Sequence, residues 1–128
     1  MKDRYRYIIA GNPNTPLRVL TKLAEDEDRF VRRRVAENSN VPQALLLQLA
    51  RDSEPEVKVA AMLAMGSSCL VLLEACFSDD MDVRYMLAEE PGVPAEILRV
   101  LIQDPNPFIA HRAMCSLAIK AGRSASAV

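Results

Sequence analysis

The chain repeats itself every 26 residues, and this period limits its possible folds more than any other feature of the sequence. One apolar column recurs at each period: Val31, Val57, Val83 and Ile109. The register extends back to Tyr5 and continues without an insertion. A period of this length is typical of solenoids, in which every repeat packs on its two neighbours.

Each period contains two short helical patterns. In the second copy, the first half places Val31 and Val35 four residues apart after an acidic stretch, as in an amphipathic helix. The second half begins with Pro42, which is tolerated in a first helical turn, and continues with Leu46 and Leu49 on one face. Helices of about ten residues are unstable alone in water. The sequence therefore predicts an all-α fold, a two-layered α-solenoid of about five helix-pair repeats.

The repeats predict a single helical-repeat domain over residues 1–120. Its register is 5–30, 31–56, 57–82 and 83–108, with a partial copy at 109–120. The remaining segment, AGRSASAV at 121–128, has no apolar pattern, and we expect it to be a disordered tail.

Two segments of the chain resemble a known family of repeats. They are the second copy, DEDRFVRRRVAENSNVPQALLLQLA, and the similar segment of the first copy, IAGNPNTPLRVLTKLAED. They resemble the leucine-rich repeat variant family, within the broader HEAT-like, armadillo-type α-solenoids. The resemblance implies a right-handed superhelix in which one helix of each pair can be a short 3-10 segment. The iron–sulfur cluster of that family belongs to an extra cysteine-rich module that has no counterpart in this sequence, so no cofactor is expected.

Composition gives little support for partners of opposite charge or for membrane insertion. Sixteen basic and seventeen acidic side chains leave a net charge of −1, which gives no reason to expect nucleic acid or an anionic membrane. The longest uncharged run, from Val59 to Leu73, is shorter than the roughly 20 residues of a membrane-spanning helix. We expect no membrane association.

The chemistry-bearing residues are few. The three cysteines, Cys69, Cys76 and Cys115, are odd in number and widely spaced, which indicates reduced thiols in a cytoplasmic protein. The single histidine, His111, lies four residues before Cys115, but a nucleophile pair needs a third, orienting group. We expect no metal site, no catalytic residues, no small-molecule substrate and no enzymatic activity.

Two charged columns follow the period. The basic column contains Arg6, Arg32, Lys58 and Arg84. The acidic column contains Asp26, Asp52 and Asp104, and it precedes the basic column by six residues. The arrangement resembles the Asp–Arg ladder of HEAT-like repeats, in which charge-assisted hydrogen bonds tie adjacent turns together. A phosphate-tracking stripe is the less favoured interpretation of the basic column.

Most of the acidic residues fall in the turn that precedes the first helix of a repeat. We interpret them as helix caps and partners of the helix dipole. Asp79, Asp80 and Asp82 could hold a divalent ion, but this stretch lacks the glycine and the distal glutamate of a calcium loop. In a solenoid, the acidic residues of successive turns would lie along one edge, and this acidic edge could attract a basic partner.

The third copy departs from the pattern, because columns that are polar or small elsewhere are apolar there. The affected residues are Leu63, Leu70, Leu73 and Phe77. If these side chains face solvent, they form an apolar patch of the kind that marks a binding surface. The alternative is that the third copy is more deeply buried or has drifted.

The sequence thus predicts a non-enzymatic helical-repeat scaffold that binds a protein partner, or a second copy of itself, through the apolar patch. The alternative function is nucleic-acid binding through the arginine cluster of Arg29, Arg32, Arg33 and Arg34, together with Lys2, Arg4 and Arg6.

Overall fold

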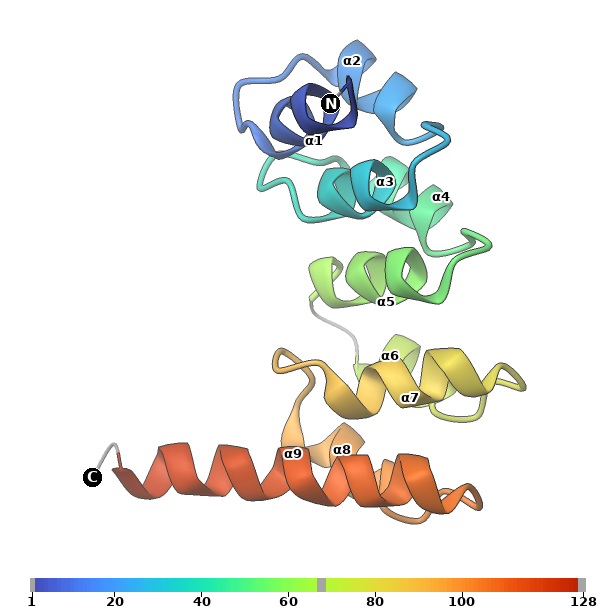
Figure 1. Ribbon diagram of the computed structural model, residues 1–128, viewed down its shortest axis with the longest axis vertical. Helices are drawn as coiled ribbons and strands as arrows, with labels where there is room; N and C mark the ends of the chain where they lie inside the picture. Colours follow the sequence, from blue (N-terminus) through green and yellow to red (C-terminus); the bar gives the residue numbers. More distant parts are fainter. Residues whose placement is uncertain (1, 67–68, 127–128) are drawn as a thin grey trace. The chain divides into compact units, whose positions relative to one another are not determined.

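The computed structural model describes residues 2–66 and 69–126, and within these ranges all regular structure is helical (Figure 1). The chain divides into two compact units, Met1–Gly66 and Ser67–Val128. We call them unit 1 and unit 2 and describe each by itself.

Unit 1 contains five of the helices. They are α1 (Lys2–Gly11), α2 (Leu17–Leu23), α3 (Arg29–Ala36), α4 (Gln43–Leu49) and α5 (Pro55–Ala64). The helices α1, α3 and α5 pack side by side in that order, and α2 and α4 pack against their neighbours in sequence (Figure 1). The first and second helical patterns of the sequence therefore alternate as observed helices.

Local sequence explains where these helices begin. The carboxylate of Asp28 accepts a hydrogen bond from the Phe30 backbone N–H at 2.8 Å, so Asp28 is the N-cap of α3. Pro16 and Pro42 have an extended conformation and lie immediately before the first residue of α2 and of α4. The sequence predicts Pro42 within the first helical turn, so the observed helix begins one residue later. The second helix of each pair is α-helical throughout the described residues, so the 3-10 segments implied by the family resemblance are not observed there.

The core of unit 1 is built from the apolar columns of the repeat. Val31, Val35 and Ala36 of α3 are fully buried, together with Leu20 and Leu49 from the second helices. Burial of one Val or Leu side chain contributes about 1.5–3 kcal/mol. This packing supplies the stability that such short helices lack on their own.

Asn38, which follows α3, is a buried polar residue with 4% of its surface exposed. Its amide nitrogen donates to the carbonyl oxygens of Ala10 at 2.7 Å and Asn12 at 2.9 Å, and its Oδ1 accepts from the Asn40 N–H at 2.8 Å. One side chain therefore closes its own turn and ties the end of α3 to the end of α1.

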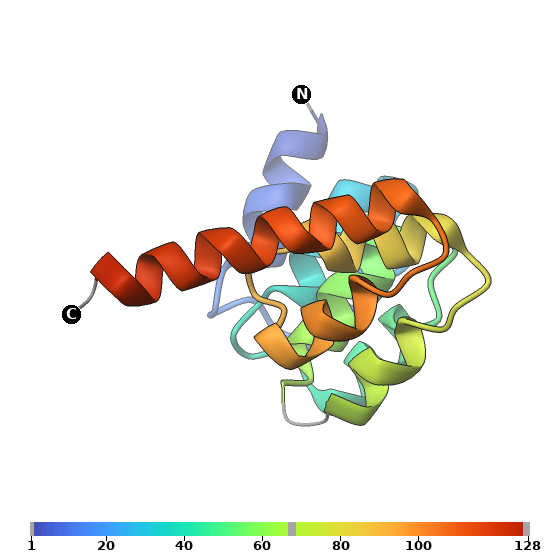
Figure 2. The same cartoon turned by 90° about the horizontal axis from the view of Figure 1, so that it is seen from below.

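Unit 2 contains α6 (Cys69–Ala75), α7 (Met81–Glu89), α8 (Ala95–Leu101) and α9 (Pro107–Ser126). The helix α9 packs against both α7 and α8 (Figure 2). The Ser116 hydroxyl of α9 donates to the Ala88 carbonyl oxygen of α7 at 2.5 Å. Ser116 occupies the column of Asn38, and Ala88 that of Ala10, so the same link between neighbouring helices recurs with a different side chain.

The end of α9 differs from the sequence prediction. The helix continues to Ser126, and its last turns extend beyond α7 and α8 (Figures 1 and 2). Residues 121–126, where the sequence predicts a disordered tail, belong to this helix, and residues 127–128 lie outside the described ranges. The segment carries no proline to end the helix, and its alanines favour helical structure.

Replacement of Asn38 tests the buried link. We expect Asn38→Ala to lower the free energy of unfolding by about 1–3 kcal/mol, because the Ala10 carbonyl loses its buried hydrogen-bond donor. Asn12→Ala is the matched control: Asn12 is in the same column and forms the same turn with the Asn14 N–H, but its side chain is exposed. Urea unfolding measures both variants, and equal losses would contradict the role of the link.

Candidate interaction surface

The charged ladder in unit 1 is centred on Arg32. Its Nε donates to Asp52 Oδ2 at 2.8 Å and its Nη2 to Asp52 Oδ1 at 3.1 Å, and its Nη1 donates to the Asp26 carbonyl oxygen at 2.7 Å. The hydrogen bond with Asp52 raises the pKa of Arg32 above its usual value. Through these hydrogen bonds, Arg32 joins the turn before α3 to the turn before α5.

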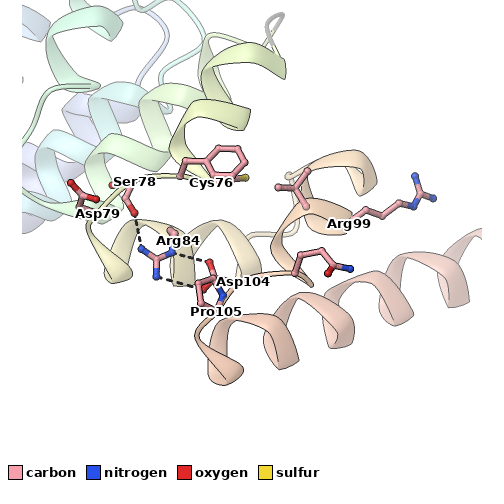
Figure 3. Close-up of a pocket in the computed structure, with 10 residues that line it drawn as sticks. Cys76, Ser78, Asp79, Arg84, Arg99, Asp104 and Pro105 are labelled. Atoms are coloured by element: carbon pink, nitrogen blue, oxygen red, sulfur yellow. Dashed lines mark hydrogen bonds and ion pairs between the residues drawn. The ribbon is translucent and has the colours of Figure 1, made fainter.

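The same arrangement recurs in unit 2. Arg84 Nε donates to Asp104 Oδ2 at 2.8 Å, and Arg84 Nη1 donates to the Ser78 carbonyl oxygen at 2.6 Å (Figure 3). A weaker rung joins Arg6 Nη1 to Asp26 Oδ2 at 3.3 Å. The partner of each arginine is thus the aspartate twenty residues after it, whereas the residue six before it contributes only its backbone carbonyl at Arg32 and Arg84.

The third copy cannot complete a rung of this kind. The residue twenty positions after Lys58 is Ser78, which has no carboxylate. Lys58 therefore belongs to the basic column of the sequence, but the acidic column supplies no aspartate for it.

The ladder aspartates also shape the turns in which they lie. Each accepts a hydrogen bond at 2.9 Å from the backbone N–H two residues further on, at Asp28, Glu54 and Asn106. One carboxylate therefore orders its own turn and holds an arginine of a neighbouring helix.

The arginines of the α3 cluster lie beside acids of the same unit. Arg29 Nε lies 2.9 Å from Glu56 Oε1, and Arg33 Nη1 lies 3.7 Å from Glu56 Oε2. Arg34 Nη1 lies 3.5 Å from Glu37 Oε1, and its guanidinium stacks 5.5 Å from the ring centre of Tyr7. Since Arg32 is paired with Asp52, each cation of the cluster faces an acid of the same unit.

The other basic residues predicted to contribute to nucleic-acid binding lie on α1. Arg4 is exposed and Arg6 contributes to the ladder, whereas the side chain of Lys2 lies outside the described residues.

The acids before the helices do not form a metal site in the described part of the chain, where no group of three potential metal-ligating side chains is found. Asp80 instead accepts a hydrogen bond from the Asp82 N–H at 2.9 Å and caps α7, as Asp28 caps α3. Asp79 is exposed beside this cap.

The predicted apolar patch falls on both units. Leu70, Leu73 and Phe77 belong to α6 and the residues after it, and their exposed fractions are 68%, 36% and 73%. They are therefore not buried by a deeper placement of the third copy. Leu63 is half-buried and belongs to α5 of unit 1. We define the α6 patch as Leu70, Leu73 and Phe77.

A pocket of about 590 Å³ adjoins the α6 patch within unit 2. Phe77 lines it together with Val100 and Gln103 of the α8 region, and the Arg84–Asp104 pair closes one side (Figure 3). Arg99 also lines the pocket, well apart from the Arg84–Asp104 pair (Figure 3). Sequence reasoning did not identify this pocket, although Phe77 and Gln103 share a column and so were expected in adjacent repeats.

The two cysteines whose side chains are described have different surroundings. Cys76 lines the pocket wall but is itself buried, and this burial raises the pKa of its thiol to about 11. Cys115 lies on α9 with its Sγ 3.6 Å from His111 Nε2, at the surface. Both thiols are free.

The chain was compared with protein-family models, with curated proteins and with solved structures, and none of them matches it. No helix in the described ranges is long and apolar enough to cross a membrane.

The ladder predicts a graded set of coupling energies. In double-mutant cycles with Arg→Gln and Asp→Asn, we expect the Arg84–Asp104 pair to couple by about 1.5–3 kcal/mol, because its hydrogen bonds are charged and shielded. The Arg6–Asp26 pair should couple by less than about 1 kcal/mol, because the Arg6 side chain is 34% exposed and that of Arg84 only 14%. Urea unfolding provides the energies, and the reverse order would contradict the interpretation.

The raised pKa of Cys76 predicts a protected thiol. At pH 8 only about one Cys76 side chain in a thousand is a thiolate, so iodoacetamide should label Cys115 and leave Cys76 unmodified until urea is added. Peptide mass spectrometry reads both sites in one sample. Because the folded pKa is raised, the free energy of unfolding should also fall as the pH rises from the ordinary thiol value toward 11. Equal labelling of the two cysteines would contradict the burial.

Proposed function

We propose that this chain is a right-handed α-solenoid of about five helix-pair repeats, of the leucine-rich repeat variant or HEAT-like kind, and that it works as a non-enzymatic scaffold for a protein partner. The regular alternation of helices within each unit supports the repeat architecture. The recurring Arg–Asp rungs, twenty residues from arginine to aspartate, support it as well. The free thiols of Cys76 and Cys115 support a cytoplasmic location.

The observation that carries the binding function is the exposure of the α6 patch. In the other repeats the same three columns are mostly polar: Arg18, Ala44 and Glu96 match Leu70; Thr21, Leu47 and Arg99 match Leu73; and Glu25, Arg51 and Gln103 match Phe77. The repeat fold therefore does not need apolar side chains there. An apolar cluster that the fold does not require and that water reaches is typical of a protein-binding surface.

The pocket gives the α6 patch a shape suited to docking. An apolar side chain of the partner can enter beside Phe77 and Val100, while Arg99 and Asp79 supply a polar rim. The acids Asp80 and Asp82 follow at the start of α7 and would steer a partner with a basic edge. Hydrophobic docking supplies the affinity, and the acidic edge sets the orientation.

The alternative of nucleic-acid binding is less well supported. A phosphate-binding stripe needs cations available to phosphate oxygens. The arginines of the α3 cluster instead contact Glu37, Asp52 and Glu56.

Substitution of the α6 patch tests the proposed function. We expect the double variant Leu70→Asp, Phe77→Asp to lose at least tenfold of the partner recovered by affinity capture from a cell extract, because two carboxylates replace the apolar surface. Quantitative mass spectrometry compares it with the wild-type chain. Both side chains are exposed, so the variant should keep the circular dichroism spectrum of the wild type.

Leu17→Asp is the matched control, since Leu17 is an exposed leucine on α2 of unit 1, with 58% of its surface exposed against 68% for Leu70. A partner that depends on the α6 patch is retained by Leu17→Asp and lost from the double variant. The proposal is wrong if both variants recover the same proteins as the wild-type chain.

A further inference from the structure

The outer surface of α1 carries apolar residues in columns that are buried in the next repeat. Tyr5, Ile8 and Ile9 are exposed, Tyr5 by 71%. The residues in the same columns of α3 are Val31, Arg34 and Val35. Both valines are fully buried in the core shared with α1 and α2, and the Arg34 guanidinium stacks on Tyr7 of α1. These columns therefore form the face that a helix turns toward the preceding helix pair.

The columns that face the following pair are identified in the same way. Arg29 and Arg33 of α3 reach Glu56 of α5, and Ala36 is fully buried. In unit 2, Ala88 of α7 shares the column of Ala36, is fully buried, and accepts the hydrogen bond from Ser116 of α9. A helix thus presents the columns of Arg29, Arg33 and Ala36 to the next helix pair.

On α9 these columns contain Pro107, His111 and Met114. All three are exposed, and Met114 is exposed by 51% although its column holds a fully buried alanine in α1, α3 and α7. We call this set the α9 face, and we call Tyr5, Ile8 and Ile9 the α1 face. The two faces are the two sides of one contact, which occurs within the chain between α1 and α3, between α3 and α5, and between α7 and α9.

We propose that the α1 face of one molecule docks on the α9 face of a second copy of this chain, so that the molecules stack head to tail. The partner that fits the α1 face is a helix that presents the columns of Arg29, Arg33 and Ala36. On α9 the residues in these columns are exposed.

This contact joins two different faces, so it does not close on itself as a twofold dimer does. A heterologous contact of this kind adds one chain after another and produces open-ended assemblies, or rings of three or more chains where the rotation closes. The contact uses none of the residues of the α6 patch, and it does not depend on the function proposed for that patch.

Light scattering tests the proposal across a hundredfold range of protein concentration. We expect the mass of the wild-type chain to rise with concentration beyond that of a dimer. Two variants each block one face: Tyr5→Asp, Ile8→Asp on α1, and His111→Asp, Met114→Asp on α9. Each variant alone should remain a monomer, because one side of every contact is charged.

An equimolar mixture of the two variants is the decisive sample. It contains one intact α9 face from the first variant and one intact α1 face from the second, so it should form a complex of two chains and grow no further. Leu70→Asp, Phe77→Asp is the matched control and should assemble like the wild-type chain. Because all the substituted side chains are exposed, circular dichroism should confirm that each variant is folded.

Three results would overturn the proposal. The first is a wild-type chain that is monomeric at every concentration. The second is a wild-type mass that stops at a dimer and is abolished in the α6-patch variant, which indicates self-association through that patch instead. The third is a mixture of the two face variants that remains monomeric.

Discussion

Helices of seven to ten residues do not persist alone in water, and eight of the nine helices in the described residues are of this length. Every other feature of the structure depends on that constraint. Each short helix must bury one apolar face on a neighbour of the same kind, as α3 does between α1 and α5. Each copy of the repeat must bury an apolar helix face on a neighbouring helix. The column of Val31 is therefore apolar in every copy.

Apolar burial by itself does not fix the position of one helix along the axis of the next, because apolar contacts are not directional and a shifted helix can bury a similar area. Directional contacts set this position. Asn38 reaches the carbonyls at the end of α1, and Arg32 holds both the Asp52 carboxylate and the Asp26 carbonyl. If one helix were shifted along the next, these polar side chains would lose their hydrogen-bond partners. They therefore select one position of the helices among several that bury a similar apolar area. Unit 2 uses the same device with Ser116 and with Arg84.

The all-helical class was predictable from the period and from the spacing of apolar residues, since both depend on local sequence. The helix ends were harder to predict: Pro42 lies just before α4 rather than within it, and α9 continues through the alanine-containing segment to Ser126. The charged columns were visible, but the sequence could not show that Arg32 pairs with the aspartate twenty residues later. That choice depends on which turns packing brings together. The pocket beside Phe77 was missed for the same reason, because its lining combines side chains from separate turns.

The exposed apolar surfaces of this chain are of two kinds, and the repeat distinguishes them. The α1 and α9 faces lie in columns that other copies bury, so they fit a surface shaped like another repeat. The α6 patch lies in columns that no repeat needs to bury, and its counterparts include Arg18, Glu96 and Gln103. A repeat-like surface has no complementary column for it. A partner of the kind proposed for the α6 patch is therefore expected to present a different kind of protein surface, whereas the α1 and α9 faces match the repeat of a second copy of the chain.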